Sequence, residues 1–251
     1  MCRLLGWVSD EPTTLATLIG DTDLHAFAAL SSDHKHGWGL AWPDGDEFMV
    51  RKSPKRALDS AMFDTTVHAV STDIGLAHLR WATSGLAVRT DNNHPFSIGP
   101  TAFAHNGAFE AHNDLLDHVP GDLHSLRTGA TDSELYYLLV LGYASEAPLD
   151  VALARAAAHI ADRHEFTSLN AMLATPDALY ALCYFYPPEL ANRPSMQYFD
   201  LVYRSDDHAV TVASTGWGAG WTSMPNRALL TVQRDTLAVT VRSVDEVLAT
   251  A

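Results

Sequence analysis

Cysteine and basic residues are scarce in this 251-residue chain. It holds two cysteines, Cys2 and Cys183, too few for the dense disulfide framework of a small secreted domain. Its 16 Lys and Arg residues are outnumbered by 30 Asp and Glu residues, which gives a formal net charge of -14. Because nucleic-acid-binding proteins neutralise phosphates with clustered Lys and Arg, this balance argues against a nucleic-acid partner.

Long apolar segments are also absent. No stretch approaches the roughly 20 apolar residues of a membrane span, so we expect no membrane partner. The chain reaches the polar residues 9–12 too early for the apolar core of a secretory signal. We therefore expect a cytoplasmic protein whose thiols stay reduced, with Cys183, in the apolar stretch ALYALCYFY, as a buried packing residue.

No internal repeat or Gly/Ser-rich linker divides the sequence, so we expect a single domain over residues 1–251. Helical patterns are concentrated in the middle and strand patterns at both ends, which favours an α+β fold with antiparallel sheet layers over a regularly alternating parallel sheet. The expected helices cover residues 13–20, 24–30, 131–145 and 149–163. The expected strands cover residues 37–42, 47–51, 74–81, 101–105, 168–174, 179–185, 201–204, 210–214, 228–233 and 237–241, the first two forming a hairpin.

Cys2 has two interpretations: an ordinary residue behind the initiator methionine, or a nucleophile that becomes the first residue of the mature protein. Removal of Met1 would place a thiol and a free α-amino group on one residue. That amine has a reference pKa of about 7.7 to 8.0, so it could take the proton of its own thiol and produce the reactive thiolate. Position alone does not decide between the two.

Other motifs accompany Cys2. Together with MCRLLGW at the start, the segments HKHGWGLAW (34–42), AHLRWATSG (77–85), NNHPF (92–96), FAHNGAF (103–109) and TDSEL (131–135) resemble, in order and spacing, the class II glutamine amidotransferase domain, a branch of the N-terminal nucleophile hydrolases. The resemblance is nearest to stand-alone bacterial members, including those that hydrolyse a γ-glutamyl group in ergothioneine biosynthesis.

The resemblance implies a fold and an activity. The fold is an αββα sandwich of two mainly antiparallel sheets between helical layers. The activity is hydrolysis, by Cys2, of the γ-amide of glutamine or of a γ-glutamyl conjugate, without a cofactor. The protein would either pass ammonia to a separate synthase subunit or act alone.

An amide-cleaving nucleophile also needs donors for the tetrahedral oxyanion. Asn106 and Gly107 follow a predicted strand, and an Asn amide with a glycine backbone N–H is a usable pair. The alternative is a simple Asn-Gly turn between strands. In the company of the other motifs we favour the oxyanion site.

Recognition of glutamine requires a cation for its α-carboxylate, and Arg80 fits because a guanidinium can bind a carboxylate bidentately. By resemblance, Thr83 and Ser84 assist Arg80, and Trp81 begins a loop that closes over the substrate. Residues 83–93 have the small and polar composition of such a lid.

The resemblance assigns the α-ammonium of the substrate to Asp132, which could also cap the helix that begins there. His34 and His36 form a His-x-His pair, but the sequence lacks the ligand spacing of a zinc site, so we expect no metal. We expect His94 and His105 to be hydrogen-bonded supports for the lid and the oxyanion strand.

Two departures from the family pattern bear on the site: the first weakens the contact assigned to Ser84, and the second leaves the group beyond the γ-glutamyl moiety open. Ser84 stands where synthase-fused members often carry His, and VASTGWGAGW lacks the acidic-Pro sequence of ergothioneine-type members. Two other functions also stay open: a catalytically silent regulator that binds glutamine or a γ-glutamyl compound, and an N-terminal cysteine amidase for other amides. The presence of Cys2 and Asn106 disfavours the first, and the charges of Arg80 and Asp132 disfavour the second.

Overall fold

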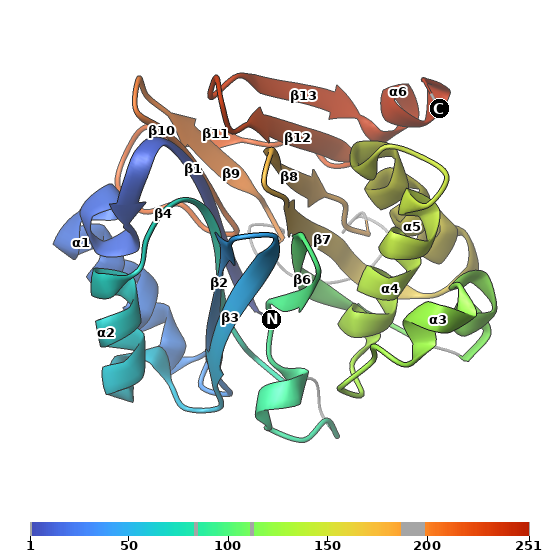
Figure 1. Ribbon diagram of the computed structural model, residues 1–251, viewed down its shortest axis with the longest axis horizontal. Helices are drawn as coiled ribbons and strands as arrows, with labels where there is room; N and C mark the ends of the chain where they lie inside the picture. Colours follow the sequence, from blue (N-terminus) through green and yellow to red (C-terminus); the bar gives the residue numbers. More distant parts are fainter. Residues whose placement is uncertain (1, 83–84, 111–112, 187–198, 251) are drawn as a thin grey trace.

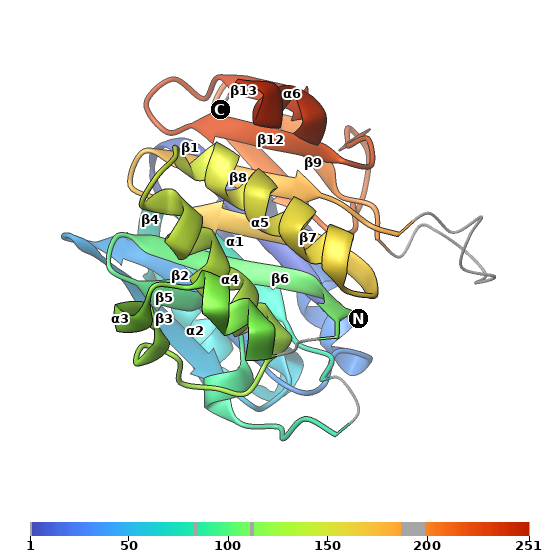
Figure 2. The same ribbon diagram turned by 90° about the vertical axis from the view of Figure 1, so that its right-hand side faces the viewer.

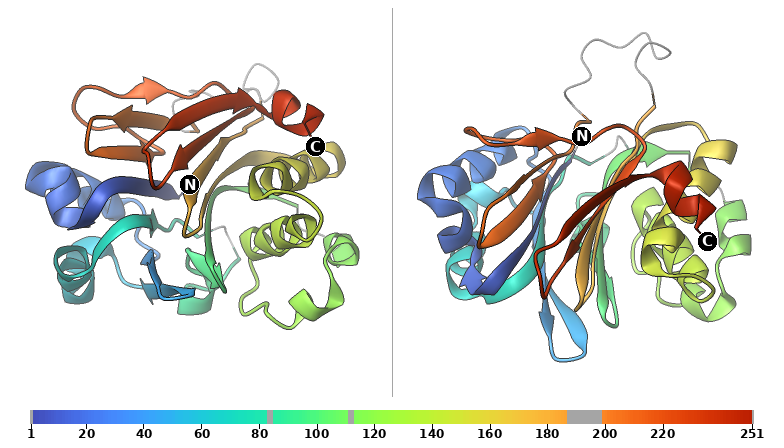
Figure 3. Two further views of the ribbon diagram at one scale, coloured as in Figure 1. Left: turned by 45° about the horizontal axis from the view of Figure 1, so that its top comes forward. Right: turned by 90° about the horizontal axis from the view of Figure 1, so that it is seen from above.

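Two antiparallel sheets lie face to face between two layers of helices (Figure 1, and from above in Figure 3). The computed structural model describes residues 2–82, 85–110, 113–186 and 199–250. Helices α1 and α2 cover the outer face of the first sheet, whereas α4 and α5 lie across the second (Figure 2). The expected αββα sandwich of an α+β fold is confirmed. The helices are α1 Leu15–Ala29, α2 Ala61–Ala69, α3 Gly121–His124, α4 Asp132–Ala144, α5 Leu149–Arg163 and α6 Val244–Ala249.

The strand order is β11-β9-β10-β1-β4-β2-β3 in the first sheet and β13-β12-β8-β7-β6-β5 in the second. The two sheets meet where β1 and β4 of the first lie against β6, β7 and β8 of the second. The strands are β1 Arg3–Thr14, β2 Trp38–Asp44, β3 Glu47–Ser53, β4 Ser71–Leu79, β5 Phe96–Ile98, β6 Thr101–Phe109, β7 Phe166–Ala174, β8 Ala178–Cys183, β9 Val202–Ser205, β10 Ala209–Ala213, β11 Thr222–Ser223, β12 Ala228–Gln233 and β13 Val239–Ser243.

Most expected elements are confirmed, with shifts of a few residues at their ends. The two short helices expected near the N-terminus are confirmed as the two parts of α1, which are separated at Gly20, whose φ of 76° is not helical. The predicted start of the first helix, at residue 13, is too early. Thr14 is the N-cap, and its hydroxyl accepts a hydrogen bond from the backbone N–H of Thr17, so the helix begins at Leu15.

The sequence analysis assigned no element to β1 or to α2. The alternating pattern of β1 is hidden because both of its faces are buried. Leu4 and Val8 point toward the second sheet, whereas Leu5 and Trp7 pack under α1 and α2. The sequence therefore shows a nearly continuous apolar run, which a strand with one exposed face would not have.

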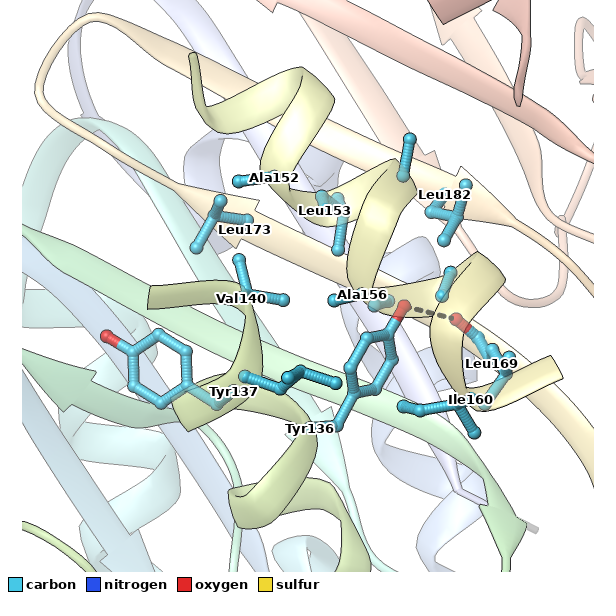
Figure 4. Packing of buried hydrophobic residues seen from close by; sticks show 14 of the residues in the cluster. Tyr136, Tyr137, Val140, Ala152, Leu153, Ala156, Ile160, Leu169, Leu173 and Leu182 are labelled. Atoms are coloured by element: carbon cyan, nitrogen blue, oxygen red, sulfur yellow. Dashed lines mark hydrogen bonds between the residues drawn. The ribbon is translucent and has the colours of Figure 1, made fainter. Parts of the chain in front are cut away.

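Helix α4 is buried on nearly all sides because it lies between α5 and the second sheet. Figure 4 shows Tyr136 and Val140 of α4 against Ala156 of α5 and Leu169 of β7. The Tyr136 hydroxyl donates to the carbonyl oxygen of Leu169 at 3.4 Å. A helix that is apolar all round either lies in a core or crosses a membrane, and no helix in the described part of the chain has the length and apolar character of a membrane span.

The layer between the two sheets changes from apolar to polar along its length. Leu4, Leu76 and Ala104 pack together in the apolar part. Because side chains alternate along a strand, the residues two positions away face the same layer. Those residues are polar and buried: Cys2, His78 and Asn106.

His78 and His94 lie in this polar part of the layer, and a third buried histidine, His105, points from β6 to the other face of the sheet, against Tyr136 of α4. The rings of His78 and His94 are 4.3 Å apart, and the backbone N–H of His105 donates to Nδ1 of His94 at 3.2 Å. Burial lowers the pKa of all three, well below the usual value for His78 and His94, and the positive charge of Arg80 acts on those two in the same direction. The folded protein therefore keeps these rings neutral.

The free energy of unfolding should decrease as the pH falls below about 6.5. The unfolded histidines take up protons there, whereas buried His78 and His94 do not. The contribution of these histidines to the free energy of unfolding is fully present above roughly pH 7.5. Below about pH 6.5 the free energy of unfolding declines by up to about 1.4 kcal/mol per pH unit for each histidine. Urea unfolding measured from about pH 7.5 to about pH 5 checks this, before most carboxylates titrate.

Two variants control this measurement. The exposed His208 has a pKa raised by its hydrogen bond to Asp10, so its contribution has the opposite sign and is lost as the pH rises. His208→Asn should leave the decrease below pH 6.5 intact, whereas His78→Leu should make it shallower. A stability that stays constant across this range would contradict the prediction.

Candidate active site

Cys2 lies directly before β1 at the polar end of the layer between the sheets, and its side chain is 9% exposed. Its sulfur accepts a hydrogen bond from the backbone N–H of Trp81 at 3.4 Å, and its S–H donates to the carbonyl oxygen of the same residue, with 3.6 Å between sulfur and oxygen. β1 itself is held by Ser214, whose hydroxyl oxygen accepts from the N–H of Leu4 at 2.9 Å. The segment around Cys2 is thus held by residues that follow β4 and β10, the two strands next to β1.

Opposing influences act on the pKa of the Cys2 thiol. Burial raises this pKa, and the negative charge of Asp132 adds to the increase. The Trp81 N–H and the positive charge of Arg80 lower it, without cancelling the effect of burial. The structure therefore brings Arg80 and Asp132 within electrostatic range of the thiol, and that thiol is protonated until a base removes its proton.

Arg80 is a buried cation that follows β4 and is 3% exposed. Its Nη1 donates to the carbonyl oxygen of Ala87 at 3.2 Å and to Oδ1 of Asn93 at 3.3 Å. Among the described residues, no carboxylate forms an ion pair with it, and none accepts a hydrogen bond from its Nε or Nη2. A buried charge without a counter-ion is costly, so this guanidinium is suited to an incoming anion.

Asp132 is the first residue of α4, and the capping function expected as one alternative belongs to its neighbour. The Thr131 hydroxyl accepts from the N–H of Glu134 at 3.2 Å and is the N-cap. Asp132 instead joins the helix to the end of β6, because its Oδ2 accepts from the backbone N–H of Phe109 at 3.1 Å. Its Oδ1 accepts from the N–H of Ser133 at 2.8 Å. The carboxylate is fixed, only partly buried, and retains free lone pairs.

Asn106 is fully buried on β6, yet among the described residues neither its amide nitrogen nor its amide oxygen has a hydrogen-bond partner. Such orphaned polar groups are rare and costly in native proteins. Its cross-strand neighbour Asn170 shows the normal case, since its amide donates to Phe199 and accepts from Tyr184. Hydrogen bonding within the described residues therefore does not explain why an amide is buried at position 106, and this amide is available to a ligand.

Gly107 follows Asn106 on a strand whose edge is open beyond Phe103, where pairing with β5 ends. The N–H groups of His105 and Phe109 both point to this edge, toward the side chains of His94 and Asp132. Alternation along the strand places the N–H of Gly107 between them, toward the same edge. Only glycine fits here, because a Cβ would lie 1.7 Å from the carbonyl oxygen of Ser168.

His94 and His105 are hydrogen-bonded, as expected. The ring of His105 lies between Ser133 Oγ, 2.9 Å from Nδ1, and the carbonyl oxygen of Ser168, 3.0 Å from Nε2. Since a carbonyl oxygen only accepts, Nε2 carries the proton and the neutral ring accepts from Ser133. This contact links the strand that carries Asn106 to the helix that carries Asp132.

The histidines of HKHGWGLAW engage separate partners. The ring of His34 contacts Trp81 edge-on at 5.7 Å, and Nδ1 of His36 accepts from the N–H of Ala82 at 2.9 Å. In residues 2–82, 85–110, 113–186 and 199–250, no three His, Cys, Asp or Glu side chains lie close enough together to hold a metal ion.

Some expected residues are placed and others lie outside the described residues. Trp81 contacts Cys2 through its backbone, and its side chain is 43% exposed. Thr83 and Ser84 lie outside the described residues. Sequence analysis assigns no function to Asn93 of NNHPF, whereas in the structure its amide oxygen accepts a hydrogen bond from the guanidinium of Arg80.

Comparisons with known proteins identify the family. The profile of the class-II glutamine amidotransferases matches residues 1–186. The chain is 31% identical over 150 residues to an uncharacterized protein of Methanocaldococcus jannaschii, covering 56% of this chain and 38% of that protein. It is 30% identical over 146 residues to glutamine–fructose-6-phosphate aminotransferase (isomerizing) of Gluconobacter oxydans, covering 57% of this chain and 22% of that enzyme. The chain thus spans less than half the length of either relative.

A solved structure described as a glutamine aminotransferase class-II domain protein from Silicibacter pomeroyi shows the same fold. Its TM-score is 0.70 at 22% identity, over 96% of this chain and 99% of the other. The sandwich expected for an N-terminal nucleophile hydrolase is thus confirmed. Since the family profile matches 186 of the 251 residues, this chain belongs to the class-II glutamine amidotransferases.

Proposed function

We propose that this chain is an enzyme that uses the thiol of Cys2 to hydrolyse the γ-amide of glutamine or of a γ-glutamyl conjugate. The products are glutamate and either ammonia or a free amine. The observation that carries the proposal is the presence of two opposite charges, on Arg80 and Asp132, within electrostatic range of one buried thiol. The amino-acid end of glutamine carries the complementary pair of charges.

The two charges divide the recognition of the substrate between them. The Nε and Nη2 atoms of Arg80 bind the α-carboxylate, and the free lone pairs of Asp132 accept from the α-ammonium. Trp81, Thr83 and Ser84, which follow Arg80 directly in sequence, complete this subsite. A substrate held in this way presents its γ-carbonyl to the sulfur of Cys2.

Catalysis requires removal of Met1, which frees the α-amino group of Cys2. Because burial keeps the thiol protonated, this amine takes its proton as the sulfur attacks the γ-carbonyl carbon. The carbonyl oxygen becomes an oxyanion held by Nδ2–H of Asn106 and the backbone N–H of Gly107. The C–N bond then breaks, and the α-ammonium returns the proton to the leaving amine. Water hydrolyses the γ-glutamyl thioester to glutamate and restores the thiol.

The wider setting follows from the relatives. Residues 1–251 act as one cytoplasmic amidotransferase domain without a cofactor. The Gluconobacter oxydans relative is named for an aminotransferase reaction on fructose 6-phosphate and is several times longer than the matched segment. The present chain either supplies ammonia to a separate synthase subunit or releases the amine of a γ-glutamyl conjugate by itself.

Cys2→Ala should abolish hydrolysis and covalent labelling by the glutamine analogue 6-diazo-5-oxo-norleucine. Intact-mass analysis of the wild type should show loss of Met1 and one adduct, which peptide mapping assigns to Cys2. The matched control is Cys183→Ala, since Cys183 is buried in the apolar layer and burial raises its pKa to about 12. It should keep both activity and labelling. Full retention of Met1 in active protein would contradict the mechanism.

Asn106→Ala should lower kcat by about 10²- to 10³-fold with little change in KM, because it removes one oxyanion donor. This substitution should lower the free energy of unfolding only slightly, since the Asn106 amide makes no hydrogen bond to any residue that the structure describes. Asn170→Ala is the matched control and should do the reverse, lowering the free energy of unfolding by about 1–3 kcal/mol while retaining kcat. An unchanged kcat in Asn106→Ala would exclude the oxyanion role.

A substrate panel should separate the charged and uncharged classes of amide. We expect glutamine and γ-glutamyl amides to be cleaved at least about 10²-fold better than acyl amides that lack the α-carboxylate and α-ammonium, because those leave Arg80 and Asp132 unpaired. Release of amine, followed with purified protein alone, is the measurement. Preference for uncharged acyl amides would instead favour a general N-terminal cysteine amidase. Faster release from conjugates than from glutamine would favour the stand-alone hydrolase.

A further inference from the structure

Asn93 is a fully buried residue whose side chain joins Arg80 to the end of β3. Its Oδ1 accepts from Nη1 of Arg80 at 3.3 Å, and its Nδ2 donates to the carbonyl oxygen of Ser53 at 2.8 Å. Its own carbonyl oxygen accepts from Nζ of Lys52 at 2.9 Å. A guanidinium only donates and a carbonyl oxygen only accepts, so these partners allow one orientation of the amide.

The amide is also held in place by the absence of a side chain at Gly37. A Cβ at this position would lie 2.1 Å from Nδ2 of Asn93 and 2.6 Å from the carbonyl oxygen of Ser53. The φ of Gly37 is 132°, a conformation that other residues rarely adopt. Gly39, the next glycine of HKHGWGLAW, likewise leaves room for the backbone of His94, since a Cβ there would lie 2.2 Å from its carbonyl oxygen. Two glycines of one motif therefore make the space that NNHPF occupies.

The chemistry of residue 93 matters as much as its position. Asp would have nearly the same shape, but its charge would neutralise Arg80 and compete with an anionic ligand. An amide oxygen supplies a hydrogen bond without a counter-charge. Nη1 is engaged by Asn93 and Ala87, which leaves Nε and Nη2 without partners among the described residues.

We infer that Asn93 is a positioning residue for substrate recognition: its neutral amide aims the Arg80 guanidinium at the α-carboxylate and leaves the positive charge uncompensated. This inference rests on the proposed function, because it assigns Arg80 to the α-carboxylate. It also gives a function to NNHPF, which orients Arg80 from a segment that is separate from it in sequence.

The test compares two reagents that reach the same sulfur. 6-Diazo-5-oxo-norleucine carries the α-carboxylate and α-ammonium of glutamine, whereas iodoacetamide carries neither. Asn93→Asp should lower the second-order rate of labelling by the first reagent, and raise KM for glutamine, by about tenfold or more. Alkylation of Cys2 by iodoacetamide, followed by peptide mapping, and kcat should each stay within about threefold of the wild type.

Two further variants make the result specific. Asn226→Asp is the matched control, because it makes the same chemical change at an amide whose hydrogen-bond partners are Phe185 and Arg227, and it also loses a hydrogen bond to a carbonyl oxygen, that of Phe185. It should change KM less than Asn93→Asp. Asn93→Ser adds no charge, so it should fold where a buried carboxylate does not, and should raise KM a few-fold with kcat retained.

Three outcomes would overturn the inference. An unchanged KM for glutamine in Asn93→Asp and Asn93→Ser would show that Arg80 does not depend on this amide. Equal losses of labelling with both reagents would show that Asn93 supports only the fold and has no separate effect on recognition of the α-carboxylate. Absence of labelling of the wild type by 6-diazo-5-oxo-norleucine would instead refute the proposed function, and this inference with it.

Discussion

The positive charge of Arg80 is the constraint on which the polar part of the layer between the two sheets depends. The guanidinium is buried beside a buried thiol, and no carboxylate among the described residues pairs with it. Burial alone disfavours such a charge and lowers its pKa. Neutral acceptors hold it in place: the carbonyl oxygen of Ala87 and the amide oxygen of Asn93. The site is thereby kept ready for an anion instead of being satisfied internally.

This arrangement is destabilising, and the rest of the layer between the sheets offsets it. The Asn106 amide, which has no hydrogen-bond partner in the described part of the chain, and the lowered pKa of His78 both indicate polar groups whose burial costs free energy. The same layer continues as an apolar core, and α4 and α5 bury a second core against the outer face of β7. Extensive apolar burial on both faces of the second sheet allows β6 to carry groups that do not stabilise the fold.

Sequence analysis predicted correctly those elements and residues that a short, continuous stretch of sequence is sufficient to identify. The hairpin of β2 and β3, the helices α4 and α5, and the charges of Arg80 and Asp132 near Cys2 could all be predicted from motifs and periodicity. It failed for β1, whose two buried faces remove the alternation. It also failed for Asn93, whose partner Ser53 is 40 residues away in sequence and contributes a backbone carbonyl that any residue type could supply. The choice between Asp132 and Thr131 as the cap depended on hydroxyl geometry that sequence does not contain.

The charges around the thiol also bear on when Cys2 becomes reactive. A substrate with both α-charges would neutralise Arg80 and Asp132 together, and these two act on the pKa of the thiol in opposite directions. Their combined neutralisation therefore changes that pKa less than the loss of the Arg80 charge alone, which is the larger of the two influences. Burial, the largest influence, remains and increases when a ligand covers the site. Substrate binding is thus poorly suited to generating a thiolate by electrostatics, so the base must be a group that moves a proton, which is the part assigned to the α-amino group of Cys2.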